Sequence, residues 1–97
     1  MEKYNIKLVN QVYESLDNIY RHKKEYDEDS AINFVSGFFD EIEKLKYLPQ
    51  RGSNKANSSK AIIYKNHLII YNIKEHNIVI ILDIIDPKQY TVAHKYY

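Results

Sequence analysis

The side chains best suited to chemistry lie in the second half of the chain, among its lysines, histidines and tyrosines. Cleavage of RNA by attack of a 2′-hydroxyl needs a base for that proton, an acid for the leaving 5′-oxygen and cations that stabilise the charge developing on the phosphate. Lysines can contact phosphate, histidines exchange protons near neutral pH, and tyrosines can donate or orient. If the protein cleaves RNA, the candidate catalytic residues are Lys60, Lys88 and Tyr90.

The same kinds of side chain could instead serve only as contacts with a partner. Ten of the 97 residues are tyrosines, and a tyrosine on a strand more often packs its ring than takes part in catalysis. The terminal segment His94-Lys95-Tyr96-Tyr97 is basic and aromatic, so it could stack on bases or enter a protein groove, or it could be a frayed chain end. The candidate binding residues are Arg51, Lys60, His67, Tyr71, Lys88, His94, Lys95, Tyr96 and Tyr97.

Positive charge is concentrated in the same half of the chain. Residues 1–49 hold seven Lys/Arg and ten Asp/Glu, a net charge of −3, whereas residues 50–97 hold seven Lys/Arg and three Asp/Glu, a net charge of +4. Any attraction for nucleic acid or an acidic partner therefore belongs to the second half. A scattered charge of +4 is equally typical of a solvated surface, because dedicated nucleic-acid-binding domains carry a stronger basic excess.

Several classes of site are not predicted. The chain has no cysteine, so it has neither a disulfide framework nor a thiolate metal site, and its four histidines lack the spacing of metal ligands. Neither glycine belongs to a phosphate-binding loop, and we expect no cofactor. The N-terminus lacks an apolar signal segment and the longest apolar run, Ile78 to Leu82, is too short to span a bilayer. We therefore expect a cytoplasmic protein.

The elements that must position these side chains begin with a strand and two helices. Residues 1–97 are short enough to predict one domain. Alternation of apolar and polar residues from Tyr4 to Val9 predicts a strand, and Asn10 is expected to cap the first helix. The acidic cluster Asp27-Glu28-Asp29 suits the start of a second helix, which Pro49 ends. An apolar stripe at helical spacing is expected to face a sheet: Ala31, Phe34, Val35, Phe38, Ile42 and Leu45.

A polar loop from Gln50 to Ser59 separates the helices from three runs rich in isoleucine and tyrosine. These runs predict three strands whose short connections make hairpins, and the last, almost entirely apolar, is expected to be central. The predicted strands are Lys60 to Tyr64, His67 to Ile73 and Ile78 to Asp86. The predicted class is α+β, with an N-terminal strand, a two-helix hairpin and an antiparallel three-stranded meander forming one sheet with the helices packed on one face.

This order of elements in so short a chain resembles the RelE/ParE toxin superfamily. The likeness covers nearly the whole chain and depends on the order and spacing of its motifs. The residues that carry it are Tyr4 to Leu8 in the opening strand, Leu45 and Leu48-Pro49-Gln50-Arg51-Gly52 at the helix exit, Lys60-Ala61-Ile62, His67 to Ile73, and Ile78 to Ile85. The resemblance implies a growth-inhibiting toxin of a type II toxin–antitoxin system that is neutralised by a cognate antitoxin protein.

Two departures from the family pattern bear on the target. Leu68 fills a position that is often arginine, and Asp86-Pro87-Lys88-Gln89-Tyr90 stands where RNA-cleaving members have a cluster of histidine or arginine. Both departures favour the ParE branch, for which the resemblance implies poisoning of DNA gyrase by protein contact. The alternatives are a ribosome-dependent mRNA endonuclease of the RelE type, and a degenerate member that only binds its antitoxin and represses their shared promoter.

Overall fold

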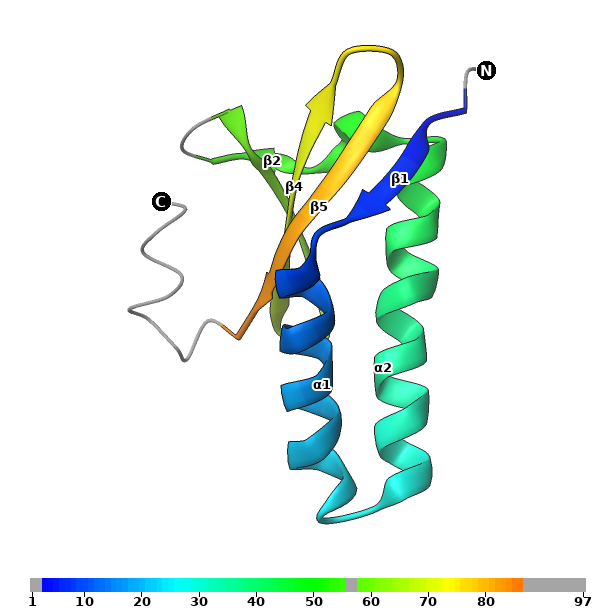
Figure 1. Ribbon diagram of the computed structural model, residues 1–97, viewed down its shortest axis with the longest axis vertical. Helices are drawn as coiled ribbons and strands as arrows, with labels where there is room; N and C mark the ends of the chain where they lie inside the picture. The colour runs from blue at the N-terminus through cyan, green and yellow to red at the C-terminus, as the bar shows by residue number, and fades with distance from the viewer. Residues whose placement is uncertain (1–2, 56–57, 87–97) are drawn as a thin grey trace.

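The first half of the chain supplies one edge strand and both helices (Figure 1). The computed structural model describes residues 3–55 and 58–86. The elements are β1 (Asn5–Leu8), α1 (Asn10–Lys24), α2 (Glu28–Glu43), the short 3-10 turns η1 (Lys44–Lys46) and η2 (Pro49–Arg51), then β2 (Ser53–Asn54), β3 (Lys60–Tyr64), β4 (His67–Lys74) and β5 (Ile78–Ile85). Among the described residues, no helix is long and apolar enough to cross a membrane.

One sheet contains all the strands of the described residues, in the order β1-β5-β4-β3-β2. Strand β1 pairs with β5 in parallel, and every other pair is antiparallel. The α+β class and the meander are thus confirmed, and β5 is an interior strand, as its apolar sequence predicts. The fifth strand, β2, was not expected, because two polar residues, Ser53 and Asn54, carry no apolar alternation.

Two tight turns fix the register of the meander. Lys65 and Asn66 both have positive φ, 50° and 63°, which is the conformation that a two-residue turn needs to match the twist of its flanking strands. The turn between β4 and β5 has three residues, Glu75 to Asn77, and its last two also have positive φ, 64° at His76 and 58° at Asn77. The pairing of Tyr64 with His67 closes the first hairpin directly at its turn. Local turn chemistry therefore sets which side chains share a face.

Of the two predicted helix starts, the structure corrects the first and confirms the second. The prediction that Asn10 caps α1 is wrong, because Val9 holds the capping position with no side-chain bond and Asn10 is the first helical residue. The start of α2 after Asp27 is confirmed. The Asp27 carboxylate accepts a hydrogen bond from Ser30 Oγ at 2.5 Å, which holds the pKa of Asp27 below its ordinary value. Acidic residues at this end of α2 also meet the positive end of the helix dipole.

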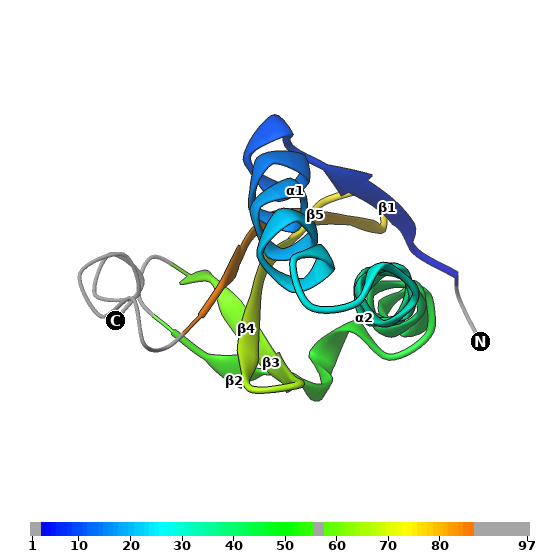
Figure 2. The same ribbon diagram turned by 90° about the horizontal axis from the view of Figure 1, so that it is seen from below.

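Apolar side chains on the two faces of the sheet form two separate clusters. Both helices pack on one face (Figure 2). The core on that face contains buried residues of the predicted α2 stripe, among them Phe38, Ile42 and Leu45, together with Ile69 and Ile81 of the sheet. Alternate strand residues point to the opposite face. There a second cluster, called the outer cluster below, consists of Ala61, Leu68, Ile70 and Ile85, with Leu82 packed against it.

A matched pair of isoleucines tests this assignment of faces. Ile69→Ala should lower the free energy of unfolding by about 2–5 kcal/mol, because Ile69 is fully buried under the helices and its removal leaves a cavity. Ile63→Ala, on the neighbouring strand, should change it by about 0.5 kcal/mol or less, because Ile63 is 73% exposed. Urea unfolding of both variants measures the difference. Equal losses would contradict the assignment.

Candidate functional site

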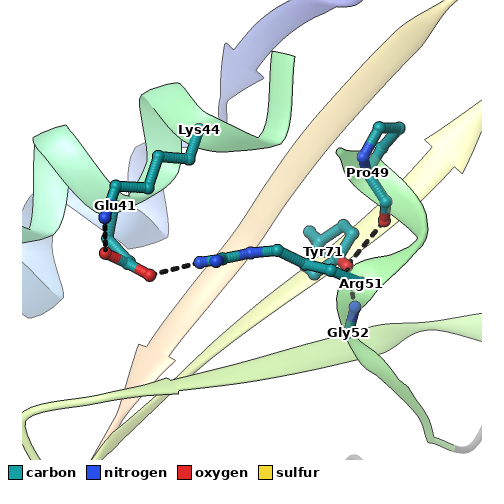
Figure 3. Close-up of polar contacts among 6 residues, drawn as sticks. All are labelled: Glu41, Lys44, Pro49, Arg51, Gly52 and Tyr71. Atoms are coloured by element: carbon teal, nitrogen blue, oxygen red, sulfur yellow. Dashed lines mark hydrogen bonds and ion pairs between the residues drawn. The ribbon is translucent and has the colours of Figure 1, made fainter. Parts of the chain in front are cut away.

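The turn that follows α2 is fastened to the sheet by Tyr71 (Figure 3). Tyr71 is fully buried in β4, and its hydroxyl donates a hydrogen bond to the Pro49 carbonyl at 2.7 Å. The same oxygen accepts a hydrogen bond from the Gly52 N–H at 3.0 Å. Burial raises the pKa of Tyr71, against the opposing effects of the Gly52 N–H and the Arg51 charge. Tyr71 therefore stays protonated and acts as a structural clamp in the described fold.

Gly52 is required by the closeness of this clamp. A Cβ atom at position 52 would lie 2.3 Å from the Tyr71 hydroxyl oxygen and 2.9 Å from the Ala61 carbonyl oxygen. Both distances are shorter than real Cβ contacts, and the second neighbour is backbone that cannot move aside freely. The Arg51-Gly52 pair in the helix exit thus has a steric reason, because glycine alone lets the turn approach β3 and β4.

Arg51 ties the same turn to the end of α2. Its guanidinium pairs with one carboxylate oxygen of Glu41, and Lys44 Nζ lies 3.1 Å from the other (Figure 3). The Glu41 side chain is 15% exposed. The hydrogen bond from Arg51, with a further contribution from Lys44, lowers the pKa of Glu41. The cation that the sequence offers for partner binding is therefore already paired within the chain.

Lys60 lies at this end of the sheet as well. It is the cross-strand partner of Tyr71, and its Nζ donates a hydrogen bond to the Asn54 side-chain oxygen at 2.8 Å. The structure thus brings together three of the predicted site residues, Arg51, Lys60 and Tyr71. Each makes a contact within the chain, and Tyr71 has no exposed surface from which to reach a partner.

His67 is the first residue of β4 and lies four residues, therefore about 13 Å, from Tyr71. Its ring stands edge-on to Phe34 and Phe38, with centroid separations of 5.7 and 5.4 Å. Its Nδ1 donates to the Lys65 carbonyl at 2.9 Å, which places a proton on that nitrogen. The ring of His67 therefore joins α2 to the β3–β4 hairpin.

An open cleft of about 560 Å³ adjoins this aromatic contact. Two cations, Lys23 and Lys65, and the carboxylate Asp86 border it together with apolar Ile63 and Leu68. The Lys23 ammonium lies 4.2 Å from the centroid of the Phe34 ring, a distance suited to a cation–π contact. The cleft thus combines charged groups of both signs with apolar surface.

Leu68, at the position where the resembling family often has arginine, belongs to the outer cluster. It is 6% exposed and packs with Ala61, Ile70 and Ile85. Its cross-strand partner is Ile85. This part of the sheet therefore presents hydrocarbon where a phosphate-binding cation would be expected.

The comparisons with known proteins agree with this fold. A family model described as "ParE toxin of type II toxin-antitoxin system, parDE" matches residues 6–89. The chain belongs to this ParE toxin family. No curated protein matches the sequence.

Two solved structures share the fold of this toxin. A chain of the chromosomal ParDE toxin–antitoxin system from P. aeruginosa has a TM-score of 0.76 and 16% sequence identity, with 87% of this chain and 96% of that chain covered. A chain of the toxin–antitoxin complex RelBE2 from Mycobacterium tuberculosis has a TM-score of 0.57 and 16% identity, with 87% and 98% covered. Together with the family match, this shared fold confirms the resemblance to the RelE/ParE superfamily.

The remaining predicted site residues of the toxin lie outside the described residues, so their roles stay predictions. They are Lys88, Tyr90, His94, Lys95, Tyr96 and Tyr97.

The sequence did not single out two carboxylates that form contacts within the fold of the toxin. The spacing of three residues between Glu41 and Lys44 weakly predicted an ion pair between them. The pairing of Glu41 with Arg51 arises only from the fold. Asp83 is 4% exposed and accepts hydrogen bonds from Ser15 Oγ at 2.7 Å and the Ile84 N–H at 2.8 Å. The sequence signal for Asp83 was its position as the single carboxylate within the apolar strand β5, because a buried carboxylate needs hydrogen-bond partners.

Removal of one oxygen atom tests the clamp. Tyr71→Phe should lower the free energy of unfolding by about 1–3 kcal/mol, because the Pro49 carbonyl and the Gly52 N–H would both lose their partner. Amide hydrogen exchange in the Pro49–Gly52 turn should also become faster. Tyr13→Phe, at a side chain that is 54% exposed, is the matched control and should leave stability unchanged. A stable Tyr71→Phe variant with an unaltered turn would disprove the clamp.

The ion pair of Glu41 predicts a specific pH dependence. Because the pKa of Glu41 in the fold is lowered from the ordinary 4.5, the pair stabilises the fold above that pH. This stabilisation disappears as pH falls through the folded-state pKa. The difference in unfolding free energy between the natural chain and Glu41→Gln should be about 1 kcal/mol at neutral pH and should vanish in acid. Glu43→Gln on the same helix is the control, since Glu43 is 63% exposed and its effect should be smaller.

Proposed function

We propose that this toxin arrests growth by stable protein contact with DNA gyrase, and that it does so without cleaving RNA. The observation that carries the proposal is the position of Leu68 within the outer cluster. RNA cleavage develops negative charge on phosphate, which positioned cations must stabilise. A site made of Ala61, Leu68, Ile70 and Ile85 offers no such charge. The choice of gyrase follows from membership of the ParE family, for which the resemblance implies this target.

The described cations beside the Pro49–Gly52 turn support the same proposal. Lys60, the described member of the candidate catalytic set, is bonded to Asn54, and Arg51 is paired with Glu41. Both contacts stabilise the surroundings of the Pro49–Gly52 turn. Moving either cation onto a phosphate would break a contact within the chain, so these side chains serve the scaffold better than they serve catalysis.

We also propose that a cognate antitoxin covers apolar surface along α2. Ile32 and Phe39 are two helical turns apart, so they lie on the same side of α2, and they are 47% and 40% exposed. Tyr47 and Leu48 follow the helix end and are also exposed. Large apolar side chains gathered on one side are typical of a protein interface. The solved relatives belong to toxin–antitoxin systems, which supports an antitoxin partner.

Two assays on the purified toxin test the proposed target. With gyrase, the toxin should block DNA supercoiling, and addition of the antitoxin should restore it. In a translation extract supplied with ready-made message, protein synthesis should continue and the message should stay intact. Lys60→Ala and Tyr90→Phe should retain growth arrest in cells at matched expression, whereas an RNA-cleaving site would lose about 10²-fold or more in rate from either change. Cleavage of ribosome-bound message with unaffected gyrase would contradict the proposal.

A further inference from the structure

Exposed apolar side chains of α1 and α2 meet along the line where the two helices touch. The helices pack side by side and run in opposite directions (Figure 1). The Tyr20 hydroxyl on α1 donates a hydrogen bond to the Glu28 carboxylate on α2 at 3.2 Å, so these residues mark the facing sides of the helices. Residues four or seven positions apart share one side of a helix. Tyr13 therefore lies on the Tyr20 side of α1. By the same spacing, Ile32 and Phe39 lie on the Glu28 side of α2.

Tyr13, Ile32 and Phe39, together called the helix seam below, are close to one another along the helices. Because the helices run in opposite directions, distances counted from the Tyr20–Glu28 contact lead the same way on both. At about 1.5 Å per residue, Ile32 lies about 6 Å, Tyr13 about 10 Å and Phe39 about 16 Å from that contact. These side chains are 54% (Tyr13), 47% (Ile32) and 40% (Phe39) exposed. Large apolar side chains grouped in water are typical of a surface that a partner covers.

Acidic side chains surround the helix seam. Residues 10–43 hold three Lys/Arg and nine Asp/Glu, a net charge of −6, whereas the rest of the chain holds eleven Lys/Arg and four Asp/Glu, a net charge of +7. Arg21 and Lys46 pair with two carboxylates beside the seam at the exposed surface, where such pairs are weak. Each apolar residue of the seam has a carboxylate one helical turn away: Asp17 after Tyr13, Glu28 before Ile32, and Glu43 after Phe39.

We propose that the helix seam receives an amphipathic helix of the antitoxin, in which lysine and arginine flank the apolar stripe. This inference rests on the proposed antitoxin contact along α2, and it adds α1 as the second wall of that site. A helix fits because it satisfies its own backbone groups, whereas α1 and α2 use theirs internally and offer none to an extended segment. The surrounding carboxylates attract a basic segment and repel an acidic segment or nucleic acid.

Cysteine labelling of the toxin, with and without the cognate antitoxin, tests this docking, since the natural chain contains no cysteine. Tyr13→Cys places a thiol in the α1 wall of the seam, and Phe39→Cys places one in the α2 wall. Tyr26→Cys is the matched control, because Tyr26 is 90% exposed in the connection between the helices. The measurement is the rate of alkylation by iodoacetamide.

All three thiols should react rapidly in the free toxin. Saturating antitoxin should slow Tyr13→Cys and Phe39→Cys about 10-fold or more and leave Tyr26→Cys unchanged. Slowing of Phe39→Cys alone would overturn the helix seam while keeping the antitoxin contact along α2. If a complex forms in size-exclusion chromatography and neither seam thiol slows, both are overturned. Absence of any complex would sink the toxin–antitoxin pairing and this inference with it.

Paired charge variants test the chemistry of the docked helix. Asp17→Asn with Glu43→Gln removes two carboxylates beside the seam, and Glu25→Gln with Glu75→Gln removes two exposed carboxylates elsewhere, so both variants have the same net charge. At low salt, the first variant should associate with the antitoxin about 3-fold or more slowly than the second, and about 1 M salt should abolish the difference. Equal rates at low salt, or faster association of the first variant, would overturn the basic character of the helix.

Discussion

The hydroxyl of Tyr71 joins the two halves of this fold. A single oxygen atom, inside the sheet, holds the Pro49 carbonyl and the Gly52 N–H, so the chain leaving the helices must turn directly against β3 and β4. The clamp needs a side chain long enough to reach from β4 to the turn, which Tyr71 supplies. It also needs a residue without Cβ beside the hydroxyl, which Gly52 supplies. The Glu41–Arg51 pair and the short strand β2 lie on either side of that turn, and both depend on its position.

Local patterns were sufficient to predict most of the fold. Helical spacing of apolar residues from Ala31 to Leu45 identified the buried side of α2, and short polar connections identified the hairpins. Two details of the fold were not predicted. Val9 holds the capping position expected for Asn10 because the chain passes from β1 into α1 without an intervening loop. Strand β2 escaped prediction because pairing with β3, and not its own sequence, makes it a strand.

The candidate site was less predictable, because its contacts join residues far apart in the sequence. Residue type alone marked Arg51, Lys60 and Tyr71 as candidates for binding, yet the fold pairs each of them within the chain. Their partners, such as Glu41, could not be recognised without the geometry that brings residues ten positions apart in the sequence together. A side chain able to bind a partner is equally able to stabilise its own scaffold, and only spatial placement distinguishes the two roles.

The two faces of the sheet show how one fold can carry different activities. The core under the helices is fixed by packing of Phe38, Ile42 and the strands, so its composition has little freedom. The outer face does not hold the helices, and its residues can change from cationic to apolar without altering the topology. In this toxin Leu68, Ile70 and Ile85 make that face apolar. An apolar face must be buried by protein, whereas a cationic face can stay in water and bind phosphate. Hydrocarbon in place of charge thus changes what the face can bind.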